Sequence, residues 1–342
     1  MKFKKSNCLT GLLLTLIILL GGLFRFHKLN WGQNYFFHPD EYHIVAAVNR
    51  LVFPRQMNPK LFTYGSFTVY LIYLTKIFFP FSAFLIGRFY SALFSTLTII
   101  LVFLIGKRLS KNPSLALLAT FLTAITPGLI QQAHFATPES TLTFWLFLAL
   151  FLLFRWQEKK ELKYLNLSAL TLGLALGTKI VALFFLPVLG LFLLVNFLAQ
   201  TRKNLIQLTK LVILPLLIVI FTFIAIFPYS FLDWFHLRYS MEYEIGLGRG
   251  QPVVFYTRQF IKTIPVIFQF QKIFPFTLGP VLSLFGLFGF LAAIVKIGFI
   301  FFKRKKVTDE PLFLLTVTFC LYFFANAFLV RVLICLRWLM YW

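Results

Sequence analysis

The sequence predicts an all-α polytopic membrane protein, a single helical bundle of about nine to ten spans over residues 1–342. Of its 342 residues 60% are hydrophobic, 47 are Phe and only 13% are charged, which exceeds what a soluble domain can bury. The apolar runs have roughly the 17–25 residues that a helix needs to cross a bilayer. They lack the ten-residue alternation of a membrane β-barrel strand.

The charge pattern excludes nucleic acid as an expected partner. The net charge of +23 comes from 33 basic and 10 acidic residues, and the basic residues form short clusters between apolar runs. Such clusters are typical of membrane topology and of contact with lipid phosphates. Cys8, Cys320 and Cys335 lie in or beside apolar runs without metal-ligand spacing, which predicts free thiols.

The basic clusters also predict an orientation. The first apolar run lacks a small-residue cleavage site, so it is expected to remain as a span with a cytoplasmic N-terminus. Basic clusters at span ends face the cytoplasm, and five are clear: 2–5, 107–111, 155–163, 202–210 and 303–306. Placing them inside gives these predicted spans: 9–24, 88–106, 113–131, 137–154, 165–178, 181–199, 211–228, 277–302 and 311–329.

This orientation predicts two large outer loops, residues 25–87 and about 229–276. The apolar run 61–85 within the first loop is too short to cross twice, so we expect it along the outer interface or as a re-entrant segment. The chain ends in what resembles the start of a tenth span, as in a C-terminally shortened bundle. Six of the ten carboxylates are then expected outside: Asp40, Glu41, Glu139, Asp233, Glu242 and Glu244.

The segment 37–43, with the sequence FHPDEYH, concentrates the chemistry of the first loop. Asp40 or Glu41, flanked by His38 and His43, could act as a general base on an acceptor hydroxyl or amine. Alternatively, Asp40 caps the helix that follows. The histidines and Asp40 could also bind a metal, but their spacing is not diagnostic of one.

Two further candidates lie near the predicted outer ends of spans. Glu139 follows Thr137-Pro138, a pattern that by itself is typical of a helix start. Lys179 follows Gly177-Thr178 and could either extend its amine to the membrane surface or bind an anionic head group.

The second loop carries aromatic and basic residues around a glycine-rich stretch. No strand precedes its glycines, so they do not form a nucleotide-binding fingerprint and more plausibly give a mobile lid. Arg249 and Arg258 suit phosphate binding, and Tyr256 suits stacking on a sugar. An ordinary interfacial loop is the alternative.

Taken in order, these motifs resemble the membrane-embedded GT-C glycosyltransferases that use phospholipid carriers, a group that includes protein O-mannosyltransferases and the lipid A aminoarabinose transferase. The similar segments are His38–Glu41, the arginine-led span Arg88–Arg108, Pro138-Glu139, Gly173–Lys179 and Tyr256–Phe260. Each motif alone is weak, and their shared order carries the resemblance.

The resemblance implies an inverting sugar transfer from a polyprenyl phosphate to a protein, lipid or glycan acceptor at the outer face of the plasma membrane. Asp40 would be the base with Glu41 beside it. Glu139 stands where the family usually has Asp, and Lys179, Arg249 and Arg258 would stabilise the departing lipid phosphate. The sequence demands no cofactor and leaves a divalent cation open. A transporter or lipid flippase is the alternative, although such proteins carry charged residues within their spans.

Overall fold

The computed structural model describes residues 2–33, 35–198, 204–248, 258, 261–302 and 311–329. Within these ranges the named elements are all helices, and the bridge between Val52 and Gln56 is the one isolated β pairing. The prediction of an all-α fold is confirmed. The first half of the chain contains α1 (Lys2–Phe26), α2 (Pro39–Arg50), α3 (Phe67–Phe78), α4 (Ala83–Ser110), α5 (Pro113–Ala124), α6 (Pro127–Ala133), α7 (Glu139–Lys159) and α8 (Leu162–Thr178).

The second half continues the bundle. It contains η1 (Ile180–Phe185), α9 (Leu186–Leu198), α10 (Leu205–Leu208), η2 (Thr209–Ile213), α11 (Leu214–Ile226), α12 (Tyr229–Leu232), α13 (Trp234–Gly248), α14 (Pro265–Phe268), η4 (Gln269–Ile273), α15 (Phe274–Thr277), α16 (Pro280–Phe302) and α17 (Pro311–Leu329). The segments η2 and η4 are π-helical turns that continue directly into α11 and α15.

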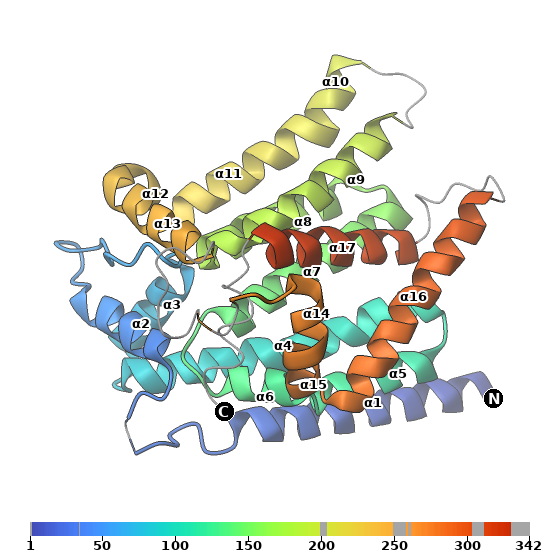
Figure 1. Cartoon of the computed structure of the whole chain (residues 1–342), viewed down its shortest axis with the longest axis horizontal. Helices are drawn as coiled ribbons and strands as arrows, with labels where there is room; N and C mark the ends of the chain where they lie inside the picture. The colour runs from blue at the N-terminus through green and yellow to red at the C-terminus, as the bar shows by residue number, and fades with distance from the viewer. Residues whose placement is uncertain are drawn as a thin grey trace.

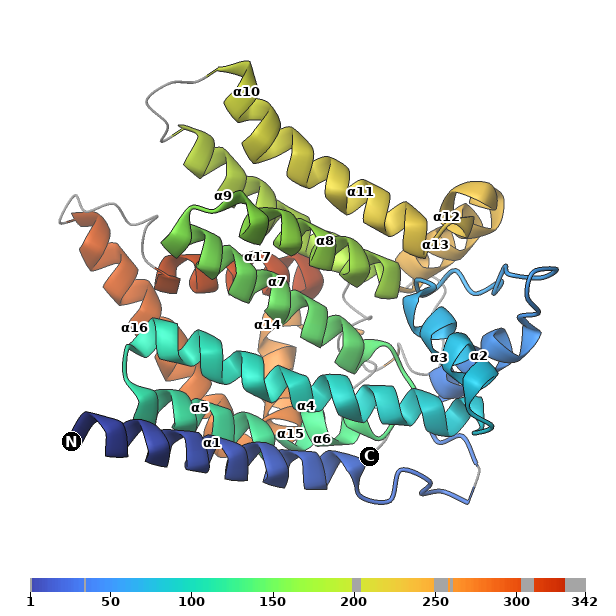
Figure 2. The same cartoon turned by 180° about the vertical axis from the view of Figure 1, so that it is seen from behind.

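The long helices run lengthwise through the bundle, as Figures 1 and 2 show from opposite sides. Helices α2, α3, α12 and α13 lie at one end of the long axis, here called the α2–α3 end. The N-terminus and the turn between α7 and α8 lie at the opposite end, here called the N-terminal end. The basic clusters 107–111 and 155–163 follow or flank helix ends there, so the bundle separates them from the predicted outer loops.

Five described helices are long and apolar enough to cross a membrane: α1 from Cys8, α4, α7, the joined α10–α11 segment and α16. The bent pair α5–α6 gives a sixth if it forms one span. The other predicted spans coincide with the shorter helices α8, η1–α9 and α17. On α1, leucines spaced by three or four residues stay exposed, as on a lipid-facing helix: Leu9, Leu12, Leu16, Leu19 and Leu23.

The predicted span 113–131 coincides with two helices rather than one straight helix, because α5 and α6 meet at a bend of 55°. Pro127 starts α6 and has no N–H to continue the helical ladder. Buried Arg25 of α1 donates to the freed carbonyl oxygens of Ala124 and Thr123 at 2.8 and 3.1 Å. The break is therefore closed by a guanidinium group from a neighbouring helix.

The two predicted outer loops differ from one another. In the first, α3 is a 12-residue helix at the α2–α3 end that packs on α2, α4 and α8, as expected for a segment that does not cross. In the second, α12 and α13 lie at the same end, but residues 265–277 form α14, η4 and α15, which pack against α17 and α6. Part of the predicted second loop therefore folds back into the bundle.

Candidate functional site

A buried ion pair holds the start of α2. The Glu41 carboxylate is fully buried and accepts from Nε and Nη2 of Arg88 at 2.8 and 3.1 Å. The same carboxylate accepts from the backbone N–H of Ala136 at 2.7 Å. The third guanidinium nitrogen, Nη1, donates to the carbonyl oxygens of Leu29 and Trp31, both at 2.9 Å. Glu41 and Arg88 thus connect α2 to α4, to the segment after α1 and to the segment before α7.

Asp40 precedes Glu41 but has different surroundings, because successive helical residues point about 100° apart. Its side chain is 14% exposed and lies 3.8 Å from Nδ1 of His38. His38, not Asp40, is the N-cap of α2: its Nδ1 accepts from the Asp40 backbone N–H at 3.1 Å. The alternative in which Asp40 serves as the cap is therefore wrong. His43 is exposed and stands three residues after Asp40, on the same face of α2.

Glu139 and Lys179 form a second ion pair. Lys179 Nζ lies 2.8 Å from Glu139 Oε1, and the two side chains are 12% and 13% exposed. Glu139 is the first residue of α7, and the cap position before it is taken by Pro138 rather than by Thr137. The Tyr64 ring lies 5.7 Å from Lys179 Nζ, which places an aromatic face beside the ammonium group.

A close approach between two glycines sets the position of Lys179. The Gly65 backbone N–H donates to the carbonyl oxygen of Thr178 at 3.1 Å. A Cβ atom on Gly65 would come within 1.9 Å of the Gly177 carbonyl oxygen, so these backbones can meet only where Gly65 has no side chain. This contact brings Tyr64 and Lys179 together.

Glu139 also lines a small polar cavity between α4, α6 and α7. The residues around this cavity are Ser95, Thr98, Leu129, Gln132, Glu139, Ser140 and Thr143. Most of them carry hydroxyl, amide or carboxylate groups, which is unusual within apolar helices. The cavity can therefore accommodate hydrogen-bonding groups beside the Glu139 carboxylate.

The acidic start of α2 contacts the short segment that leads into the acidic start of α7. Glu41 accepts from Ala136, and the His38 ring lies 5.1 Å from the Phe135 ring. Three residues after Ala136 the chain reaches Glu139. The expectation that α2 and the start of α7 come together is supported by these contacts.

The remaining predicted residues are more dispersed. Arg258 is exposed, whereas Arg249 and Tyr256 lie outside the described residues. In the second loop, the hydrogen bond from His236 lowers the pKa of Asp233 below its ordinary value. Asp233 also accepts from Asn58 at 2.8 Å, which attaches the first loop to α13.

Sequence reasoning did not assign roles to Arg88, Tyr64 or Arg25. Arg88 and Arg25 had a recognisable signal, because an arginine within or at the end of an apolar run needs a buried partner. Tyr64 had no such signal. Among the described residues, His, Cys, Asp and Glu side chains form no group of three or more that could hold a metal ion.

The fold and these acidic helix starts define a class: a multi-pass helical membrane protein with the GT-C fold. A sequence model of the family described as dolichyl-phosphate-mannose-protein mannosyltransferase matches residues 64–240. The match covers more than half of the chain, and the chain belongs to this family. The matched range includes Arg88, Glu139 and Lys179, while Asp40 and Glu41 precede it.

Individual relatives are distant. An uncharacterized protein of Aquifex aeolicus (strain VF5) is 31% identical over 100 residues, which are 29% of this chain and 20% of that protein. The Archaeoglobus fulgidus oligosaccharyltransferase, in complex with Zn and sulfate, shares 18% identity at a TM-score of 0.58 over 95% of this chain and 48% of its own.

A second similar structure is the S. cerevisiae protein O-mannosyltransferase Pmt1-Pmt2 complex bound to the sugar donor. It shares 17% identity at a TM-score of 0.54 and covers 67% of this chain and 34% of its own. At these identities the two solved structures establish the fold. The chain spans about half of the archaeal chain and about a third of the yeast one.

Proposed function

We propose that this protein transfers a sugar from a polyprenyl-phosphate donor to an acceptor, with inversion at the sugar carbon. Family membership supports the reaction class. Similar structures are described with a sugar donor, with a dolichol-phosphate and with an acceptor peptide, which supports a lipid-linked donor and a protein acceptor here. The observation that carries the proposal is that α2 contacts Phe135 and Ala136, the segment that leads directly into Glu139 at the start of α7.

Asp40 is the proposed general base. Its carboxylate is partly exposed, so it can reach an acceptor hydroxyl or amine, whereas Glu41 is fully buried and engaged by Arg88. Removing the acceptor proton makes the acceptor oxygen or nitrogen a better nucleophile for the sugar carbon. Glu41 accordingly acts as a positioning residue that fixes α2.

Lys179 is the proposed partner of the departing lipid phosphate. Its ammonium group is oriented by Glu139 at 2.8 Å and by the Tyr64 ring. A cation held in place before reaction stabilises the negative charge that develops on the phosphate as the glycosidic bond breaks. Arg258 and Arg249 of the second loop, with Tyr256 on the sugar, complete the proposed donor site, and His38 and His43 flank the acceptor.

The orientation is also a proposal. We place the N-terminus in the cytoplasm and the α2–α3 end on the outer face of the plasma membrane, because the basic clusters 107–111 and 155–163 lie at the N-terminal end. A polyprenyl tail then stays in the hydrocarbon while the reactive phosphosugar lies at head-group level. An active site at the membrane surface follows from that geometry.

The test is sugar transfer by the purified full chain reconstituted in lipid vesicles, supplied with a radiolabelled polyprenyl-phosphate sugar and candidate acceptor peptides. Asp40→Asn should abolish transfer while leaving expression and folding unchanged. Glu161→Gln, an exposed carboxylate at the N-terminal end, is the matched control and should retain activity. Undiminished transfer by Asp40→Asn would remove Asp40 as the base, and label that crosses vesicles without leaving its lipid would favour a flippase.

A further inference from the structure

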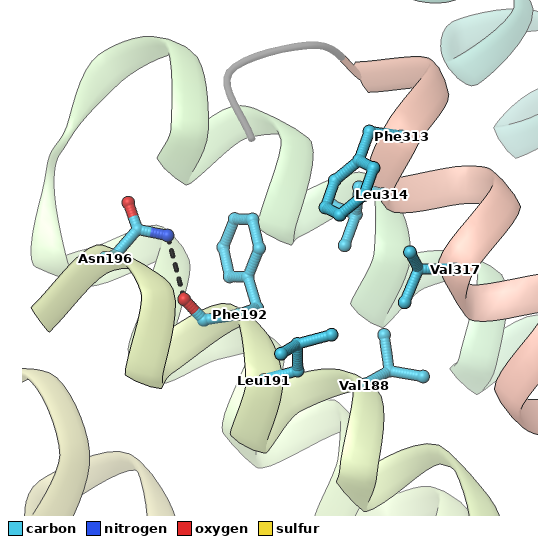
Figure 3. Close-up of a pocket in the computed structure, with 7 residues that line it drawn as sticks. All are labelled: Val188, Leu191, Phe192, Asn196, Phe313, Leu314 and Val317. Carbon is cyan, nitrogen blue, oxygen red and sulfur yellow. Dashed lines mark hydrogen bonds between the residues drawn. The ribbon is translucent and has the colours of Figure 1, made fainter. Parts of the chain in front are cut away.

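An apolar groove separates α9 from α17, away from the acidic site. Figure 3 shows three side chains of α9 facing three of α17 across it, with Asn196 at one end. The residues that line the groove are Val188, Leu191, Phe192, Asn196, Phe313, Leu314 and Val317. Six of these seven side chains are apolar, so the groove suits a hydrocarbon chain rather than a polar ligand.

The groove lies toward the N-terminal end of the bundle, because α9 ends and α17 begins there (Figures 1 and 2). Its one polar lining residue, Asn196, donates through Nδ2 to the Phe192 carbonyl oxygen at 2.8 Å (Figure 3). The side-chain oxygen of Asn196 accepts from Lys160 Nζ at 3.4 Å. Lys160 therefore sets a positive charge at the polar end of the groove.

Lys160 is well placed to hold an anion. Its ammonium group lies 5.6 Å from the Trp156 ring, and the Trp156 ring packs on Phe192 of the groove wall at 5.2 Å. The ion pairs at this end join other basic residues to Glu158 and Glu161, and among the described side chains no carboxylate is within ion-pair distance of Lys160.

The charged residues around Lys160 are also mostly positive. The described basic side chains at helix ends around this part of the bundle outnumber its two carboxylates: Lys107, Arg108, Lys111, Arg155, Lys159, Lys160, Lys163 and Lys210. A basic end of a membrane bundle attracts anionic lipid head groups, at about 1 kcal/mol per lysine near the surface.

We propose that the groove between α9 and α17 binds one acyl chain of an anionic phospholipid, whose phosphate is held by Lys160. The apolar walls take the chain, and the cationic end takes the head group. The site is separate from the proposed sugar-transfer site, which lies on α2, α7 and α8. Its occupant stabilises the contact of α17 with α9.

The test is native mass spectrometry of the detergent-purified full chain after incubation with phosphatidylglycerol or, in parallel, phosphatidylcholine. The wild-type chain should retain one phosphatidylglycerol, and Lys160→Gln should lower that occupancy by about fivefold, the loss expected for one lysine contact. Lys111→Gln removes an equal charge from an exposed helix cap at the same end and should bind as wild type.

A second set of variants tests the binding of the acyl chain by placing a bulky side chain in the groove. Val317→Phe fills the groove and should prevent retention of the lipid, and Leu191→Phe at the groove rim serves if Val317→Phe does not fold. Leu194→Phe adds the same bulk to an exposed position of α9 outside the groove and should have no effect. Equal retention of the two lipids, or equal occupancy across all variants, would overturn the proposal.

Discussion

The buried pair of Glu41 and Arg88 allows the two adjacent acids of the first loop to be separated by experiment. Both partners are 0% exposed. Glu41→Gln keeps an oxygen that can accept from Ala136 but leaves the Arg88 charge uncompensated. Removing one partner of a buried pair costs about 3–5 kcal/mol, so the folding equilibrium should fall by about 100-fold or more.

The assay is unfolding of the purified chain in mixed micelles by titration with dodecyl sulfate, followed by tryptophan fluorescence. Trp31 lies 4.9 Å from the Arg88 guanidinium and reports directly on this region. The double variant Glu41→Gln/Arg88→Met removes both charges, so it should recover at least about 2 kcal/mol relative to the sum of the single variants. Asp40→Asn, at the neighbouring and partly exposed position, should stay within about 1 kcal/mol of wild type.

Two results would refute this reasoning. One is a Glu41→Gln chain as stable as wild type, which would mean that Arg88 does not depend on this carboxylate. The other is additivity of Glu41→Gln and Arg88→Met, because residues in one ion pair should show a coupling energy.

Three further predictions concern other contacts. Gly65→Ala should lower stability and sugar transfer, since a Cβ atom there meets a carbonyl oxygen at 1.9 Å, whereas Gly190→Ala, with nothing within 4 Å, should be tolerated in the same unfolding titration. Arg25→Leu removes the Arg25 donor from the Ala124 carbonyl oxygen at the helix break and should cost about 1–3 kcal/mol; unchanged stability would mean that another donor reaches this oxygen. The hydrogen bond from His236 lowers the pKa of Asp233, so its contribution is complete above the unfolded-state pKa of about 3.9 and is lost as the pH falls through the lower folded-state pKa. Limited proteolysis of the first loop should therefore increase below about pH 4, and Asp233→Asn should remove that pH dependence.

The course of the helices could be predicted from the sequence because it depends on local properties. The length and low charge of each apolar run determine whether it forms a membrane-spanning helix. The predicted spans accordingly coincide with α1, α4, α7 and the later helices. Even the bend at Pro127 had a local signal, since proline interrupts the helical ladder.

The candidate site could be predicted only in part. The sequence singled out Asp40, Glu41, Glu139 and Lys179 as residue types suited to sugar transfer. The structure pairs Glu139 with Lys179 and joins Glu41 to the segment just before α7. Sequence reasoning alone could not assign different roles to Asp40 and Glu41. That difference depends on Arg88, which lies 47 positions after Glu41 in the chain.

By itself, then, the amino-acid sequence determined a helical membrane bundle, its basic end and its short inventory of acids. The tertiary structure decided that Glu41 is neutralised by Arg88, that Lys179 is oriented by Glu139, and that residues 265–277 return into the bundle. The physical reason is the distance along the chain over which each feature is determined. The hydrophobicity of a segment depends only on its own residues, whereas an ion pair or a glycine contact needs two distant segments to pack at one place.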